Sequence, residues 1–162
     1  LSILEAIKDT LGQKHPSTLT CMANLSAALA NKGEWELAED LGVKVLKMRR
    51  EVLGETHPHT LTCAYNLAAL YQNVGRYREA EALQSATFEK RKAAFGEGHS
   101  TTLASMASLV SILRLQSRYE EAKTLAEQVL ELRKYRLPEE HPDLLTSMSD
   151  LAMMCPVHYS GH

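Results

Sequence analysis

The sequence predicts an all-α protein, an α-solenoid built from stacked antiparallel helix pairs. Three observations lead to this prediction: a 42-residue internal repeat, apolar residues spaced three and four apart within each repeat, and Gly and Pro placed where helices would begin and end. The composition agrees, since 44% of the residues are apolar and only 6% are aromatic. A chain of 162 residues is long enough to form one array with a sizeable core.

The repeat is visible in two motifs that keep the same spacing. A ten-residue linker occurs four times, as LGQKHPSTLT from Leu11, LGETHPHTLT from Leu53, FGEGHSTTLA from Phe95 and LPEEHPDLLT from Leu137. A second block recurs as GEWELAED from Gly33, GRYREAEA from Gly75 and SRYEEAKT from Ser117. The predicted organisation is the second helix of a preceding repeat at 1–10, repeats at 11–52, 53–94 and 95–136, the first helix of a fourth repeat at 137–154, and an irregular tail at 155–162.

Each repeat is expected to contain two helices. In the second repeat they are predicted at about 58–73 and 76–94. The second helix of a repeat has one apolar face, which in the first repeat consists of Ala38, Leu41, Val45, Met48 and Val52. The first helix is apolar over a wider arc, as a helix packed on two sides requires.

Glycine, proline and histidine mark the predicted helix ends. Gly33 and Gly75 fall at the turn within a repeat, where a positive φ costs glycine little. Proline after the histidine suits the first position of a helix and holds the histidine itself out of helical angles. An imidazole nitrogen can then accept a bond from a free backbone N–H. The predicted capping residues are His15, His57, His99 and His141.

The segment 66–83, NLAALYQNVGRYREAEAL, resembles a tetratricopeptide repeat. The matching signature positions are Leu67, Ala68, Tyr71, Gly75, Tyr77 and Ala80. The 42-residue period and the LG-x-x-HP linker are similar to the repeats of kinesin light chains, of nephrocystin-type proteins and of the sensor regions of NB-ARC (STAND) receptor ATPases. The sequence pattern TLT-x-x-x-NLA at 60–68 is most similar to the repeats of that last group. The resemblance covers about residues 1–154 and implies a superhelix of such repeats.

The resemblance also implies that the first helices line a concave groove that binds a protein or peptide partner. Asn24 and Asn66 are the sharpest candidates, because an asparagine here in related repeats hydrogen-bonds the backbone of an extended peptide. The alternative is that these amides bond only within the array. The predicted groove residues are Asn24, Thr62, Tyr65, Asn66, Asn73, Ser108, Ser111, Arg114 and Asp150. Arg114 is the only cation among them, which argues against the clamp for a terminal carboxylate found in chaperone-binding relatives.

For the other residues that could carry chemistry, the sequence favours structural roles. A small residue recurs every 42 positions and indicates a packed site: Cys21, Cys63, Ser105 and Ser147. The basic clusters 47–50 and 90–92 fall at the ends of second helices, where cations complement the helix dipole. We expect these clusters to be solvated helix ends rather than a nucleic-acid site, since no aromatic residues are interleaved with them.

The sequence predicts neither catalysis nor a bound cofactor. Histidines one repeat apart cannot share a metal ion, and Cys155, His158 and His162 lack a fourth ligand for structural zinc. A formal net charge of -2 gives no basic field for nucleic acid, and no apolar run approaches the roughly 20 residues that span a bilayer. We therefore expect a cytoplasmic, non-enzymatic binding protein whose partner is a protein or a peptide.

The resemblance favours one biological context, and two alternatives stay open. We expect the array to be the ligand-sensing region of a STAND receptor, and a cargo adapter of the kinesin light chain type is an alternative. The array could instead be a structural module that stacks end to end and forms a homo-oligomer through exposed terminal helices. The chain is expected to start within a repeat, because 1–10 align with 43–52.

Overall fold

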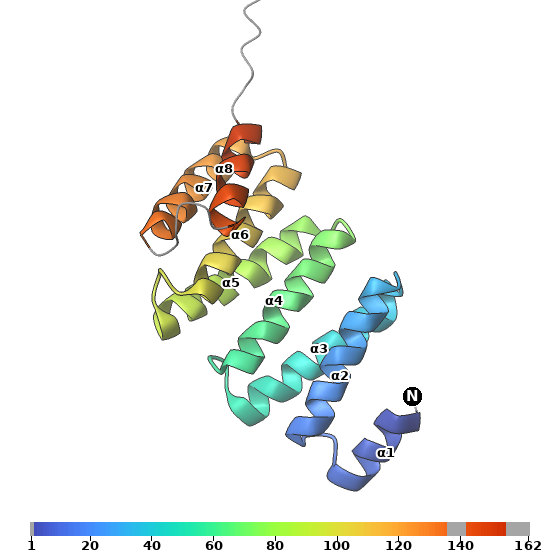
Figure 1. Ribbon diagram of the computed structural model, residues 1–162. Coiled ribbons are helices and arrows are strands. Elements are labelled where there is room, and N and C mark those ends of the chain that lie inside the picture. The colour runs from blue at the N-terminus through green and yellow to red at the C-terminus, as the bar shows by residue number, and fades with distance from the viewer. Residues whose placement is uncertain (1, 136–141, 155–162) are drawn as a thin grey trace, which may run out of the picture. The chain divides into compact units, whose positions relative to one another are not determined.

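The computed structural model describes residues 2–135 and 142–154, and all its secondary structure in these ranges is α-helical. The helices are α1 (Ser2–Leu11), α2 (Pro16–Asn31), α3 (Trp35–Leu53), α4 (Pro58–Asn73), α5 (Tyr77–Phe95), α6 (Ser100–Leu115), α7 (Tyr119–Lys134) and α8 (Pro142–Met154) (Figure 1). The all-α prediction is confirmed, and α4 has the predicted bounds. His141, the tail at 155–162 and the set Cys155, His158 and His162 lie outside the described residues.

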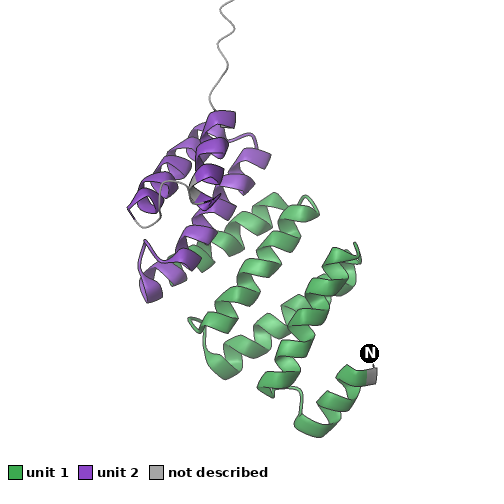
Figure 2. Cartoon of the chain, viewed as in Figure 1, with its two compact units in different colours: residues 1–90 green, residues 91–162 purple. Residues whose placement is uncertain are grey.

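The chain divides into two compact units, residues 1–90 and 91–162 (Figure 2). Their boundary falls within α5. In unit 1, α3 packs against both α2 and α4, and α1 packs against α2. In unit 2, α7 packs against both α6 and α8. Each unit therefore contains first and second helices of the repeat in alternating contact.

Apolar residues at helical spacing form the core of each unit. In unit 1 the buried cluster brings together Leu4 of α1, Met22 of α2, Val45 of α3 and Leu67 of α4. In unit 2 the cluster contains Val110, Leu113, Ala122 and Ala126, with Leu151 packed against it. As the sequence pattern predicts, first helices pack on two sides: α2 lies against both α1 and α3, and α4 residues lie between residues of α3 and α5.

Three first helices begin with a histidine cap. The backbone at each histidine is extended, and its Nδ1 accepts a bond from the backbone N–H two residues further on. His15 accepts from Ser17 at 3.2 Å, His57 from His59 at 3.1 Å, and His99 from Thr101 at 3.2 Å. The imidazole thus has the role that Ser, Asp or Asn usually has at this position.

Ser117 adopts a backbone conformation that favours glycine. Its φ is 60°, and Gly33 and Gly75 have φ of 81° and 83° at the same turn of the preceding repeats. The N–H of Ser117 donates to the carbonyl of Arg114 at 2.9 Å, which closes the turn after α6. The third repeat therefore keeps the turn although a side chain opposes its backbone angles.

An arginine joins each of three second helices to the following first helix, and Arg49 and Arg91, two of the three, are buried. Arg49 donates through Nη1 to the carbonyl of His59 (3.2 Å) and to Sγ of Cys63 (3.0 Å). Arg91 donates in the same way to the carbonyl of Thr101 and to Oγ of Ser105, both at 2.9 Å. The same side chain therefore crosses the junction between repeats in both units.

The third such bond lies in unit 2, where Arg133 donates to the carbonyl of Asp143 at 2.7 Å and to Oγ of Ser147. The predicted small residue at a packed site is thus an acceptor for arginine. The prediction of solvated basic clusters was wrong for Arg49 and Arg91, which are 6% and 5% exposed. They are buried because the next repeat covers the end of their helix and supplies two acceptors for the guanidinium.

Candidate functional site

The α2 and α4 helices contact each other and form one face of unit 1, with α3 packed against both. Asn24 on α2 and Asn66 on α4 occupy equivalent positions of successive repeats, and both side chains are exposed. Thr62 and Asn73 are also exposed on α4, while Tyr65 is half-buried. The five predicted groove residues that belong to unit 1 therefore lie on these two neighbouring helices.

The amides of Asn24 and Asn66 form no hydrogen bond with any residue in the described ranges. This finding disfavours the alternative in which they bond only within the array. Thr62 differs from them, because its hydroxyl donates to the carbonyl of Pro58 in its own helix at 2.9 Å. The two asparagines thus retain both donor and acceptor groups for a molecule outside the array.

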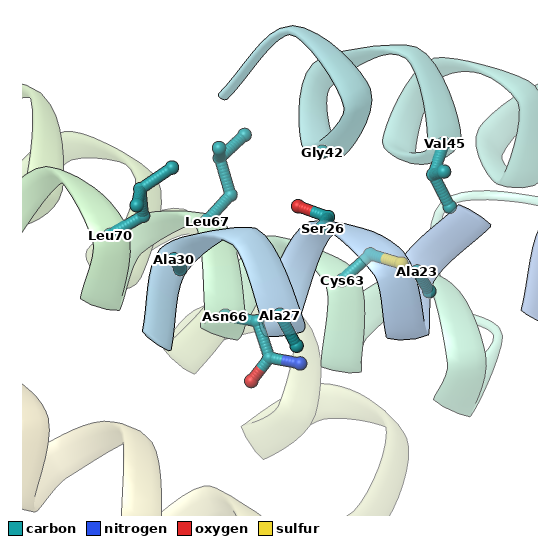
Figure 3. A pocket seen from close by; sticks show the side chains of 10 residues that line it. All are labelled: Ala23, Ser26, Ala27, Ala30, Gly42, Val45, Cys63, Asn66, Leu67 and Leu70. Atoms are coloured by element: carbon teal, nitrogen blue, oxygen red, sulfur yellow. The ribbon is translucent and has the colours of Figure 1, made fainter. Parts of the chain in front are cut away.

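A cavity of about 60 Å³ lies beside Asn66, between α2, α3 and α4 (Figure 3). The residues that line it are Ala23, Ser26, Ala27, Ala30, Gly42, Val45, Cys63, Asn66, Leu67 and Leu70. Gly42 and Val45 of α3 lie on one side of the cavity, and Asn66 and Ala27 lie on the opposite side (Figure 3). Asn66 and Ala27 are exposed. The cavity therefore opens to solvent on their side, which is the α2–α4 face.

The cavity exists because small residues face one another. A Cβ at Gly42 would lie 3.2 Å from Oγ of Ser26 and 3.4 Å from Cδ1 of Leu67, so even one methyl group would occupy part of the space. The hydroxyl of Ser26 already donates to the carbonyl of Ala38 at 2.7 Å. Burial raises the pKa of the Cys63 thiol, although Arg49 opposes this rise, and the thiol stays protonated at neutral pH. The wall of the cavity is therefore uncharged and mainly apolar.

The equivalent space in unit 2 measures only about 10 Å³. Val110 occupies the position of Ser26, and Ala126 occupies the position of Gly42, so larger side chains fill it. Asp150 replaces the asparagine and forms an ion pair with Arg114, with 3.4 Å between Oδ1 and Nη1. The two units thus differ at the same place in the repeat.

The predicted groove residues of unit 2 are less accessible than those of unit 1. Ser108 and Ser111 are half-buried, and the hydroxyl of Ser111 donates to the carbonyl of Ala107 at 3.4 Å. The charge of Arg114 is balanced by Asp150. The chemistry available for recognition is therefore richest on the α2–α4 face of unit 1.

Sequence reasoning missed the cavity and the buried arginines. A glycine in the middle of a predicted helix was the available signal for the cavity, since such a residue usually has a packing or functional reason. The arginines recur at 49, 91 and 133 with the same period as the small residues that accept their bonds. Among the described residues, no group of His, Cys, Asp and Glu is arranged to hold a metal ion, and no helix is long and apolar enough to cross a membrane.

A family model described as tetratricopeptide repeat matches residues 24–89 and 61–134. Two crystal structures of a Podosopora anserina protein, described as a kinesin light chain with nearly identical TPR-like repeats, are 27% and 28% identical to the chain. Each covers 94% of this chain and 72% of that chain, with TM-scores of 0.83 and 0.82. The structure of BtubC (BKLC) from P. vanneervenii, at 17% identity, is similar in fold alone, with a TM-score of 0.78 over 86% of this chain and 56% of that chain. No curated protein sequence matches the chain.

Proposed function

The chain belongs to the tetratricopeptide repeat family, and on this premise we propose that it is a non-enzymatic module that binds a protein or peptide on the α2–α4 face of unit 1. The observation that carries the proposal is the pair of exposed amides of Asn24 and Asn66, which have no hydrogen-bond partner among the described residues. The cavity beside Asn66 supports the same location.

An extended peptide is the ligand that fits this chemistry best. A carboxamide offers a donor and an acceptor, which match the C=O and N–H of a peptide backbone whatever its sequence. Two such amides at equivalent positions of neighbouring repeats can hold one backbone at two points. The helices are already packed, so little conformational entropy is lost on the protein's side when the peptide binds.

The cavity adds a preference for one side chain. Its volume of about 60 Å³ exceeds the roughly 10–15 Å³ that a single water requires, and its wall offers few polar partners to hold water. A small aliphatic side chain of the peptide would fill it and bury apolar surface. In unit 2 the smaller space and the ion pair between Arg114 and Asp150 leave no such room, so the preference belongs to unit 1.

The biological setting that we favour is a cytoplasmic adapter of the kinesin light chain type. Two similar structures at 27% and 28% identity are described as a kinesin light chain, which supports this setting over the sensor region of a STAND receptor. An upstream coiled coil in the full reading frame would support the adapter, whereas an upstream nucleotide-binding module would support the receptor.

The proposal can be tested with a phage-displayed library of short linear peptides selected on the 162-residue chain. The selected peptides are then titrated against Asn24→Ala/Asn66→Ala, with Gln128→Ala on the exposed side of α7 as the matched control. We expect the double variant to lose binding and the control to retain it. Equal binding by the parent and the double variant would place the site elsewhere on the molecule.

A second variant separates the cavity from the amides. Gly42→Ala should fold, because the third repeat carries Ala126 at the same position. It should still bind through the asparagines but should select peptides without an aliphatic residue at a fixed position. An unchanged selection profile would show that the cavity makes no contribution to recognition.

A further inference from the structure

The two helices of the α2–α4 face contain no Asp, Glu, Lys or Arg. The structure describes both helices completely, and each has 16 residues. Because 23% of the whole chain is charged, about seven such residues would be expected in two helices of this length. The neighbouring α3 differs, since it has charged residues at five exposed positions: Glu36, Asp40, Lys44, Lys47 and Glu51.

Burial of the first helices explains only part of this absence. Charged residues are rarely buried without a partner, so the packed sides of α2 and α4 are expected to be uncharged. The exposed positions of both helices, however, are also occupied by Ser, Thr, Asn, Ala and Pro, with His59 at the start of α4 as the single ionisable group. A lysine or a glutamate at such a position would cost the fold little. The neutrality of the exposed positions is therefore not required by folding, and it restricts what the face can bind.

The neutrality extends into the cavity beside Asn66. None of the residues that line the cavity is charged (Figure 3). Arg49 lies behind this wall, where its Nη1 donates to Sγ of Cys63 at 3.0 Å and to the carbonyl of His59 at 3.2 Å. Its side chain is 6% exposed and does not line the cavity. A carboxylate or an ammonium group of a ligand would therefore lose water here without gaining an opposite charge.

We propose that the peptide segment bound on the α2–α4 face is uncharged and that the face rejects acidic and basic segments alike. The inference rests on the proposed function, in which Asn24 and Asn66 hold the peptide backbone. Those amides match the backbone of any sequence, so they do not select among peptides. Selection comes from the missing counter-charges, because an unpaired charge on the ligand weakens binding whatever its sign. Small polar and aliphatic side chains do not meet this cost.

Salt dependence and a charge scan of one peptide test the proposal. A peptide from the phage selection is chosen that loses binding to Asn24→Ala/Asn66→Ala, which establishes that it occupies this face. We expect its Kd to change by less than about twofold between about 0.05 M and about 0.5 M NaCl, because salt screens only charged contacts. Replacing each residue of the peptide by Glu and by Lys should weaken binding about tenfold at the contacting positions, with either sign of charge.

A charge placed on the face should change its preference. Ala27 is exposed and lies on the same side of the cavity as Asn66, so Ala27→Lys adds one cation there (Figure 3). This variant should bind Glu-substituted peptides about tenfold more tightly than the parent chain does, and their affinity should then fall with salt. Ala82→Lys is the matched control, because Ala82 is exposed on α5 and its counterpart in the first repeat is the exposed Asp40. The control should bind every peptide as the parent does, and circular dichroism establishes that both variants are folded.

Two kinds of failure can be told apart. A Glu- or Lys-substituted peptide that binds the parent chain more tightly than the unsubstituted peptide, or a Kd that rises about tenfold with salt, would overturn the preference for an uncharged segment and leave the Asn24 and Asn66 site in place. A selection that yields no peptide dependent on these two asparagines would overturn the proposed function, and with it the preference.

Discussion

Replacing Arg91 by methionine should destabilise unit 2, although the substitution removes a buried charge. Arg91 lies at the end of α5, is 5% exposed and binds two groups of α6. Methionine retains an unbranched apolar side chain, so the packing of the arginine stem is largely preserved. The substitution therefore tests the hydrogen bonds rather than the volume.

The expected magnitude follows from what the two acceptors lose. The carbonyl of Thr101 lies in the first turn of α6 and keeps its helical N–H partner, so its loss is modest. The hydroxyl of Ser105 is fully buried and loses a charged donor. A bond to a charged group contributes about 1.5–3 kcal/mol, and the two together give an expected loss of about 2–4 kcal/mol.

Urea unfolding followed by circular dichroism measures this loss as a change in the free energy of unfolding. Arg78→Met on the exposed side of α5 is the control and should change it by less than about 0.5 kcal/mol. Adding Ser105→Ala to Arg91→Met should recover about 1–2 kcal/mol, because no buried hydroxyl is then left without its donor. The reasoning would be refuted if Arg91→Met lowered the free energy of unfolding no more than Arg78→Met does. It would also be refuted if the loss in the double variant equalled the sum of the losses in Arg91→Met and Ser105→Ala.

Three further predictions concern the turn, the caps and the thiol. Ser117→Gly should raise the free energy of unfolding by about 0.5–1 kcal/mol, because glycine adopts a φ of 60° without strain, and urea unfolding would detect it; a decrease would contradict this. His57→Ala should lower it by about 1 kcal/mol through loss of the cap, whereas His57→Asp should not, as thermal unfolding of the two variants would show. Burial raises the pKa of the Cys63 thiol, so the unfolded chain releases the thiol proton first and the free energy of unfolding falls as the pH rises through about 8.5. Urea unfolding as a function of pH should show that Cys63→Ser weakens this pH dependence. An unchanged profile would exclude the thiol as its source.

The fold could be predicted because its signals are local and periodic. The spacing of the linker histidines defines the repeat, and the alternation of apolar faces defines the helices within it. The candidate site could be predicted only in part. Asn24 and Asn66 are visible as equivalent polar residues on otherwise apolar helices, but a sequence does not reveal that their amides are without partners.

Burial of charge was the feature that local patterns could not predict. Arg49 and Arg50 are neighbours with the same composition around them, yet Arg49 is 6% exposed, whereas Arg50 is partly exposed and pairs with the carboxylate of Glu55. The helix dipole argument applies equally to both residues. Only the position of the next repeat decides which of them is enclosed, and that position depends on contacts between segments far apart in the sequence.

The contacts that Arg49, Arg91 and Arg133 make with the following first helix, here called the arginine junctions, bear on how such an array changes its length. Each repeat contributes the donor at its end and the acceptor near its beginning, so a duplicated 42-residue segment carries one half of a junction on each side. A new copy inserted next to Arg91 would meet Ser105 or its equivalent and restore the same bond. The junction of α1 with α2 pairs Ile7 with Cys21 at these positions and lacks the donor. Gain or loss of whole repeats at the arginine junctions thus leaves no guanidinium without an acceptor, and the array can be lengthened or shortened there in single units.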